Sequence, residues 1–221
     1  MEFTEVARTT FACREFTDDP VPDEVLYRLL DVARFASSGG NRQGWKVIVV
    51  KDRDARRRLA DLSRPAWALY QAQRAAGESP YNTVVPSAVD PDEGSRRPTP
   101  APLIDALVDV PVLLVVAVDL EMVASIDRDL DRVGVISGAS VYPFVWNLLL
   151  AARDAGLGGA LTTLFSAQEP AAQALLGLPP QVAVAALVPL GRPAKQLTKL
   201  TRKPVEAFAT VDRFDGRPLT P

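Results

Sequence analysis

The segment VISGASVYPFVWNLLLAARDAG, residues 135–156, predicts a helix through most of its length, and its residues are apolar on almost every side. A helix of this kind must be covered all round, either at the centre of the domain or in an interface between subunits. Pro143 either begins the main helical part or kinks it, and Gly156 is a suitable residue to end it. The fold is therefore expected to be built around this helix.

Three apolar segments predict strands. Residues 110–118, VPVLLVVAV, are continuously apolar, which is typical of a strand buried on both faces. The other two strands are predicted at residues 45–50, WKVIVV, and 181–191, QVAVAALVPLG. Further helices are predicted at residues 22–36, 52–76 and 169–179, and a short strand or turn at 157–164. Long helices that alternate with a few strands indicate an α+β or α/β class.

The region between the first two strands carries three further signals. Pro65 is a residue at which the helix over 52–76 can be interrupted. The basic run Arg56 to Arg58 is interpreted as a solvated helix face rather than a binding patch. Residues 78–102 contain repeated prolines among polar residues, so this part is predicted as loop, either a functional lid or disordered.

Composition narrows the function classes. The 221 residues, 48% of them hydrophobic, suit one domain, and a net charge of −2 with interspersed signs argues against nucleic-acid binding. The longest apolar run is too short to cross a bilayer and the first ten residues lack a signal pattern, so a cytoplasmic protein without membrane attachment is expected. One cysteine, Cys13, and no histidine exclude histidine-based catalysis and leave no cysteine or histidine metal site. The chemistry is expected to come from a borrowed cofactor or from carboxylates, hydroxyls and amides.

Neither a GxGxxG nor a P-loop pattern is present, so a nucleotide-like cofactor needs a less local binding device. Arg14, in TTFACREFTDDPVP, suits bidentate phosphate contact, although taken alone it is more simply explained by a surface ion pair with Asp18 or Asp19. The stretch SSGGNRQ at 37–43 is either a ligand cradle or an ordinary glycine-rich turn.

A third candidate is AGLGGALTTL, residues 155–164, together with TKLTRKP at 198–204. Gly158 and Gly159 would let the backbone lie flat against a planar ring, and Lys199, Arg202 and Lys203 could balance an anion. The alternative is that the glycines mark a turn or bulge and that the basic residues form a solvated tail.

Taken in order, these segments resemble the FMN-dependent nitroreductase family along nearly the whole chain. The resemblance rests on Arg14 and Phe16 in TTFACREFTDDPV, on ASSGGNRQGW at 36–45, on NLLLAARDAGLG at 147–158, and on the GRP and RKP motifs near the end. It implies a three-layer α+β fold, in which helices flank a mixed, mostly antiparallel sheet, and an intertwined homodimer. Residues 1–221 would form one domain, with 64–109 as a variable excursion at the substrate entry and 195–221 as a C-terminal arm.

The resemblance also implies which residues hold FMN. The phosphate and ribityl chain would be held by Arg14, Arg202 and Lys199, and the flavin of the partner subunit by Ser38, Asn41 and Gln43. Leu161, Thr162 and Thr163 would lie beside the reactive N5, where an amide or hydroxyl of Thr162 or Thr163 would favour the reduced ring.

Thr10 and Ala12 stand where the family has an arginine and a serine, so the phosphate grip is expected to lose one charge and one hydroxyl unless Arg8 or the tail compensates. A charge-assisted hydrogen bond contributes about 1.5–3 kcal/mol, so FMN would bind roughly ten- to a hundredfold more weakly.

The implied activity is hydride transfer from NAD(P)H through FMN N5 to a small oxidant, such as a nitroaromatic or a quinone. The cofactor would supply this chemistry, which suits a chain without histidine. Two alternatives stay open: a family member that binds or sequesters flavin or a small aromatic ligand without turnover, and a flavin-dependent dehydrogenase of a biosynthetic pathway.

Overall fold

The computed structural model describes residues 1–221, and a four-stranded antiparallel sheet lies at the centre of its fold. Its strands are β1 (Trp45–Val49), β2 (Val112–Asp119), β3 (Gly158–Gly159) and β4 (Val182–Gly191), in the order β1-β2-β4-β3. The helices are α1 (Phe3–Thr9), α2 (Asp23–Ala33), α3 (Arg53–Ala75), α4 (Pro91–Arg96), α5 (Pro102–Asp105), α6 (Tyr142–Asp154) and α7 (Glu169–Leu176). The strands and most of the longer helices lie where the sequence predicts them.

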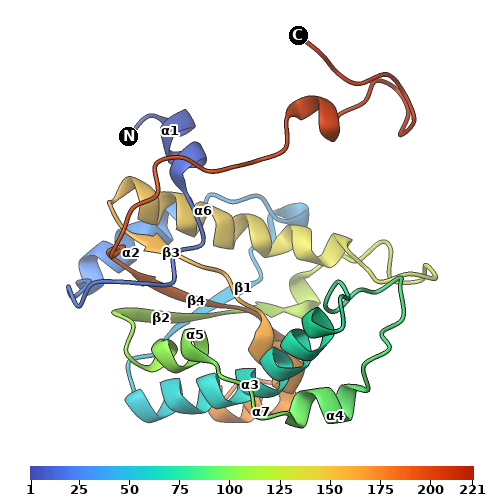
Figure 1. The fold of residues 1–221 in the computed structure, drawn as a ribbon. Helices are drawn as coiled ribbons and strands as arrows, with labels where there is room; N and C mark the ends of the chain where they lie inside the picture. Colours follow the sequence, from blue (N-terminus) through green and yellow to red (C-terminus); the bar gives the residue numbers. More distant parts are fainter.

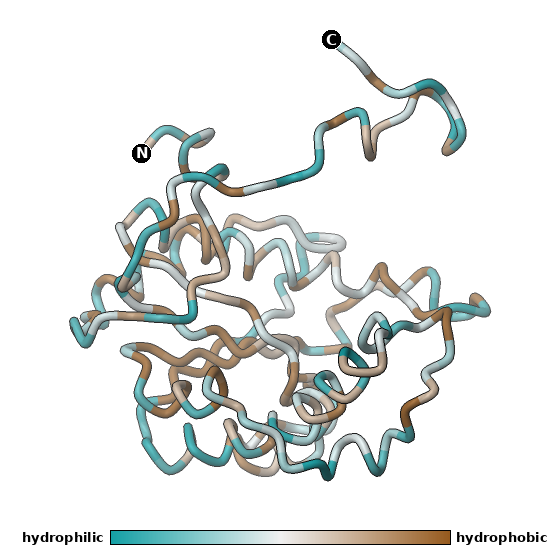
Figure 2. Tube along the Cα trace, in the orientation of Figure 1, coloured by the Kyte–Doolittle hydropathy of each residue, from teal (hydrophilic) through white to brown (hydrophobic).

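The sheet separates two helical layers, as Figure 1 shows: α2 and α6 cover one face, and α3, α5 and α7 cover the other. Every pairing between named strands is antiparallel. The sheet is mixed only through one isolated parallel bridge, between Ala12 and Gly159. The hydrophobic residues concentrate in the strands at the centre, which matches the burial of β2 and β4 (Figure 2). The expected three-layer α+β fold is confirmed.

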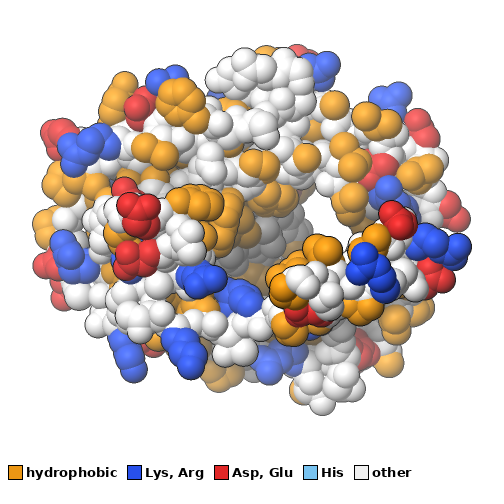
Figure 3. Space-filling view, turned by 90° about the horizontal axis from the view of Figure 1, so that it is seen from above, with side chains coloured by type: hydrophobic (Ala, Val, Ile, Leu, Met, Phe, Trp, Pro, Cys, Tyr) orange, Lys and Arg blue, Asp and Glu red, His pale blue; other side chains and the backbone are white.

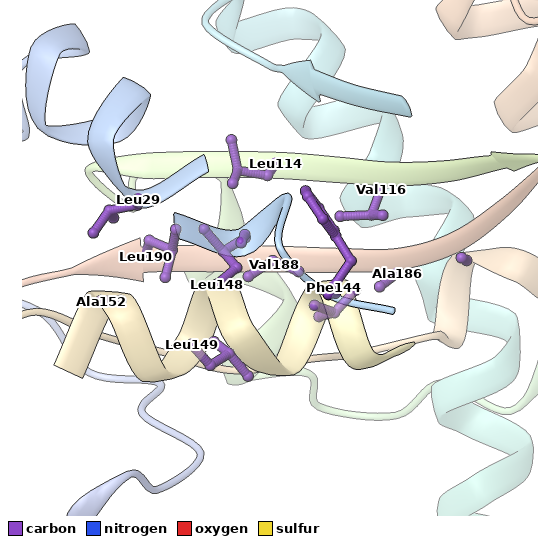
Figure 4. Close-up of a cluster of buried hydrophobic side chains, with 14 of the residues drawn as sticks. Leu29, Leu114, Val116, Phe144, Leu148, Leu149, Ala152, Ala186, Val188 and Leu190 are labelled. Atoms are coloured by element: carbon purple, nitrogen blue, oxygen red, sulfur yellow. The ribbon is translucent and has the colours of Figure 1, made fainter. Parts of the chain in front are cut away.

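Two hydrophobic cores fill the spaces between the layers. In the first, Phe144 and Leu148 of α6 point towards Val188 and its neighbours in the sheet (Figure 4), and Phe144 stacks on Trp45 with 5.0 Å between ring centroids. The second core lies on the other face, around Leu59 and Phe165. Successive β2 residues alternate between the two cores, and this requires the continuous apolar run seen in the sequence.

Helix α6 is covered on one side only by its own chain. Its face towards the sheet is buried, but Tyr142 and Trp146 on the other side are 41% and 48% exposed. Pro143 lies in the first turn, so it begins the helix and does not kink it. The helix was expected either at the centre of the domain or in an interface between subunits. The exposed side of α6 excludes the first of these, since its own chain does not cover it.

Helix α3 runs without a break through Pro65, so the expected interruption is absent. The burial of Leu59, Ala60 and Ala66 against the core offsets the hydrogen bond that proline removes. The basic run is also not solvated throughout, because Arg56 is partly buried. Its Nε donates to the carbonyl of Val50 at 2.8 Å and its Nη1 to that of Val110 at 2.7 Å, and burial lowers the pKa of the guanidinium.

The excursion after α3 is more ordered than the proline content predicts. Helix α4 lies within it and is capped at its N-terminus by Asp90, whose side chain accepts from the Glu93 N–H at 2.9 Å. Gly94 is buried against Leu69 of α3, and a Cβ there would lie 2.7 Å from the Leu69 side chain. The prediction of loop over 78–102 is therefore wrong for α4, since one glycine allows the helix to dock.

Residues 195–221 leave the body of the molecule and extend away from it (Figure 1). Their order is local, with a short 3₁₀ helix at Val205–Ala207 and a bridge between Thr210 and Pro218. Phe208 and Phe214 on this arm are exposed. No helix of the chain combines the length and the apolar character needed to span a bilayer.

Replacing Arg56 by Met should lower the free energy of unfolding by about 2 kcal/mol, because the buried carbonyls of Val50 and Val110 lose a charged donor. Urea unfolding followed by circular dichroism measures the change. Arg58→Met, on the exposed side of the same helix, is the control and should change stability little. Equal effects of the two substitutions would contradict the role assigned to Arg56.

Candidate functional site

A cavity of about 400 Å³ lies between α3, α5, the N-terminal segment and the loop that follows β3. Its lining includes Arg14, Trp67, Tyr70, Arg74 and residues 160–164. Most of the lining is hydrophobic, and the polar groups are few, as in sites that bind small organic molecules. In the space-filling view, hydrophobic and basic side chains border a hollow in one face of the molecule (Figure 3).

The loop after β3 brings Leu161, Thr162 and Thr163 to the cavity surface. Thr162 exchanges both backbone hydrogen bonds with Leu187, at 3.0 and 2.8 Å, so its amide is not free for a ligand. The N–H groups of Leu161 and Thr163 and the hydroxyls of both threonines make no hydrogen bond within the chain. Of the donors expected on Thr162 and Thr163, the Thr162 amide is excluded, and the Thr163 N–H and the two hydroxyls remain free. The Leu161 N–H is a further free donor at this loop.

Gly158 and Gly159 do not face the cavity. Both are buried in the sheet, and a Cβ on Gly159 would lie 2.4 Å from the Leu190 side chain and 2.8 Å from the Pro189 carbonyl oxygen. The Gly159 carbonyl accepts from the Cys13 N–H at 2.9 Å. These glycines let the N-terminal segment and β4 approach closely, so the idea that their own backbone lies against a planar ring is wrong.

The N-terminal segment places Arg14 at the cavity, and its only hydrogen bond is a weak one, at 3.4 Å, to the carbonyl of Ala12. It forms no ion pair with Asp18 or Asp19, and Asp19 pairs with Arg192. The hydroxyl of Thr10 is buried and donates to the Val6 carbonyl at 2.8 Å, so it cannot replace the missing family arginine.

Cys13, next to Arg14, is fully buried, and burial raises the pKa of its thiol. A thiol held protonated in this way is not a nucleophile at neutral pH. The cysteine is therefore part of the packing beneath the cavity and not of its chemistry.

One wall of the cavity comes from α3 and was not predicted. Ser63, Trp67, Tyr70 and Arg74 recur at helical spacing on one face of this helix. The indole N–H of Trp67 donates to the Pro100 carbonyl at 2.9 Å, and the Trp67 and Tyr70 rings stack with 5.8 Å between centroids and an interplanar angle of 6°. The helical spacing of these four residues is visible in the sequence, but the same spacing is found in helices that pack against a core, so it does not predict a cavity wall.

The turn that carries Ser38, Asn41 and Gln43 does not line this cavity. It is braced from within: the Gln43 N–H donates to Ser38 Oγ at 2.9 Å, and Gln43 Nε2 donates to Asn41 Oδ1 at 3.1 Å. Asn41 and Gln43 have φ angles of 54° and 52°, in the left-handed region that asparagine tolerates best after glycine. The exposed Asn41 side-chain amide nitrogen makes no hydrogen bond within the chain and remains free to donate outward.

Loop 120–140 supports this turn. The Gly39 N–H donates to Ser140 Oγ at 3.3 Å, and a Cβ on Gly44 would lie 2.7 Å from that of Met122. Within the loop, the buried Asp127 carboxylate accepts from the Val135 N–H at 2.8 Å and from Arg132 at 2.7 Å, and these contacts hold its pKa below the usual range. The other oxygen, Oδ1, is buried without a partner.

Lys199 and Arg202 are exposed on the arm and do not line the cavity. Arg202 donates only to the neighbouring Thr201 carbonyl, at 2.8 Å. The chain thus brings together Arg14 and residues 161–163, but not the turn 38–43 or the basic arm.

The sequence model of the Nitroreductase family matches residues 7–192. The chain belongs to the nitroreductase family. Among curated members, the chain is 26% identical over 208 residues to the iodotyrosine deiodinase of Nematostella vectensis, covering 93% of this chain and 73% of the relative. It is 27% identical over 201 residues to an NADH dehydrogenase of Thermus thermophilus, covering 87% of each protein.

Solved nitroreductase-family structures have the same fold. The NADPH:FMN oxidoreductase of Vibrio harveyi, in complex with NAD⁺, superposes with a TM-score of 0.69 at 20% identity, covering 96% of this chain and 78% of the other. An oxidised iodotyrosine deiodinase bound to FMN and 3-iodo-L-tyrosine superposes with a TM-score of 0.64 at 22% identity, covering 96% and 98%. At this level of identity the likeness establishes the fold, and the family establishes flavin-dependent oxidoreduction as its chemistry.

Asp127→Asn should destabilise the protein at neutral pH and have little effect in acid. Because the folded-state pKa is lowered, the stabilisation by the carboxylate is present above the unfolded value of about 4 and is lost as pH falls through the folded value. Urea unfolding of both proteins over a pH series checks this. A difference in stability that does not shrink on acidification would contradict it.

Proposed function

We propose that the protein is an FMN-dependent oxidoreductase that passes hydride from NAD(P)H to a small oxidant such as a nitroaromatic or a quinone. The observation that carries the proposal is the cavity, in which an unpaired guanidinium, Arg14, and the free donors of residues 161–163 meet beside a hydrophobic wall. When bound, FMN supplies reversible two-electron chemistry at its ring.

The residues present fit this cofactor. Arg14 would hold the phosphate as a charge-assisted donor. The N–H groups of Leu161 and Thr163, with the hydroxyls of Thr162 and Thr163, would donate to the polar edge of the ring. Because these groups already stand free at the surface of a fixed loop, binding costs little reorganisation.

The remaining cofactor residues would come from a second copy of the chain. The free Asn41 amide and the hydroxyl of Ser38 lie away from the cavity of their own chain, and Gln43 would serve mainly to orient Asn41. Lys199 and Arg202 lie on an arm whose contact with the body of its own chain is at Gln196, which donates to the Thr9 carbonyl at 3.1 Å, and both would reach the phosphate in the dimer.

The surface available for such a homodimer is apolar. Tyr142 and Trp146 on the open side of α6 are exposed. A mostly hydrophobic groove further along α6, at Leu150 and Ala151, is lined also by Phe3, Val32 and Phe35. Exposed aromatic residues gathered in this way are typical of protein interfaces. A homodimer also gives α6 the cover on its second side that its sequence demands.

A flavin-binding protein without turnover is the second candidate. The small number of groups available to bind the phosphate favours this candidate. The Thr10 hydroxyl donates to the Val6 carbonyl of α1, and Ala12 has no hydroxyl. A biosynthetic flavin-dependent dehydrogenase would use the same residues and differs only in its substrate.

Anaerobic reduction of the purified, FMN-loaded protein separates these candidates. The proposal predicts a yellow protein that bleaches with NADPH or NADH and is re-oxidised by members of a nitroaromatic and quinone panel. A loaded protein that stays oxidised with both nicotinamides would contradict the proposed reductase activity. A protein that cannot be loaded would contradict the cofactor assignment itself.

Arg14→Ala should weaken FMN binding about ten- to a hundredfold, because the phosphate loses a charge-assisted contact. Fluorescence titration of apoprotein with FMN measures the dissociation constant. Arg58→Ala is a matched control, since Arg58 is an exposed arginine of α3 outside the cavity lining. Unchanged FMN affinity in Arg14→Ala would remove Arg14 from the site.

A further inference from the structure

The charge of the cavity lining is one-sided. Arg14 and Arg74 are its charged residues, and no aspartate or glutamate lines it. Neither arginine forms an ion pair, whereas Arg64 on the same helix binds both Asp61 and Asp105. Two unpaired guanidinium groups in one mostly hydrophobic cavity favour an anionic occupant.

The two cations come from different elements. Arg14 precedes α2 and belongs with the part of the lining assigned to FMN phosphate, while Arg74 lies in the last turn of α3. One FMN phosphate accounts for Arg14 but leaves Arg74 without an anion. A second anionic group is therefore expected in the cavity.

The surroundings of Arg74 specify the shape of that second ligand. Tyr70 lies one helical turn before Arg74, and its ring stacks nearly parallel to that of Trp67. The bond from Trp67 to the Pro100 carbonyl fixes the indole, so the aromatic wall is oriented before a ligand arrives. A fixed aromatic surface next to a guanidinium suits a flat ring that carries an acidic group.

We propose that the substrate is an aromatic carboxylate, whose ring packs against Trp67 and Tyr70 and whose carboxylate pairs with Arg74. The inference rests on the proposed function, since it takes the FMN phosphate to occupy Arg14. It assigns the choice of substrate charge to Arg74, in the last turn of α3.

Ligand binding to the oxidised protein, without nicotinamide, tests this. The probes are 4-nitrobenzoate and its neutral isostere 4-nitrobenzamide, titrated into the FMN-loaded protein and followed by calorimetry and by the change in flavin absorbance. The carboxylate should bind about tenfold or more tightly than the amide. Arg74→Gln should abolish this preference and leave the affinity for 4-nitrobenzamide unchanged.

Arg58→Gln is the matched control and should keep the preference. Equal affinities of the two probes, or a preference that survives Arg74→Gln, would overturn the proposal. So would loss of FMN from Arg74→Gln, because Arg74 would then serve the cofactor. Failure of NAD(P)H to reduce the flavin would instead contradict the proposed function, and calorimetry would still report on Arg74.

Discussion

The antiparallel pairing of β2 with β4 buries both strands on both faces, and the other elements take their positions from it. Two doubly buried strands require a helical layer on each side, so α2 and α6 cover one face and α3, α5 and α7 the other. The same pair fixes the site: Leu187 of β4 holds Thr162 by two backbone bonds, and Gly159 lets the segment before Arg14 pack against the sheet edge.

Under the proposed function, one chain would hold only part of the flavin site. The cavity carries the cationic and loop donors, whereas Asn41 lies outside its lining, on a turn that loop 120–140 contacts through Ser140. The open side of α6 and the extended arm are the surfaces that a second copy would cover. Cofactor binding and dimer formation are therefore expected to be coupled, each contributing to the stability of the other.

Much of the fold could be predicted because burial leaves a direct pattern in the sequence. The apolar runs at 45–50, 110–118 and 181–191 predict strands of a covered sheet, and the structure has β1, β2 and β4 there. Helix α4 could not be predicted, since its docking depends on one close approach, that of Gly94 to Leu69. The α3 wall was missed for a related reason: its spacing fits core packing as well as a cavity, and only the positions of α5 and residues 160–164 decide between them.

The central claim is that Arg14 of one chain and Asn41 of another complete one flavin site, and mixed dimers test it most directly. Arg14→Ala and Asn41→Ala homodimers should each bind FMN more weakly than the native homodimer. Heterodimers isolated with two affinity tags should regain one FMN per dimer, because one of their two sites contains both native residues. Heterodimers that bind no more FMN than either homodimer would show that the two residues act within one chain, and would contradict the account.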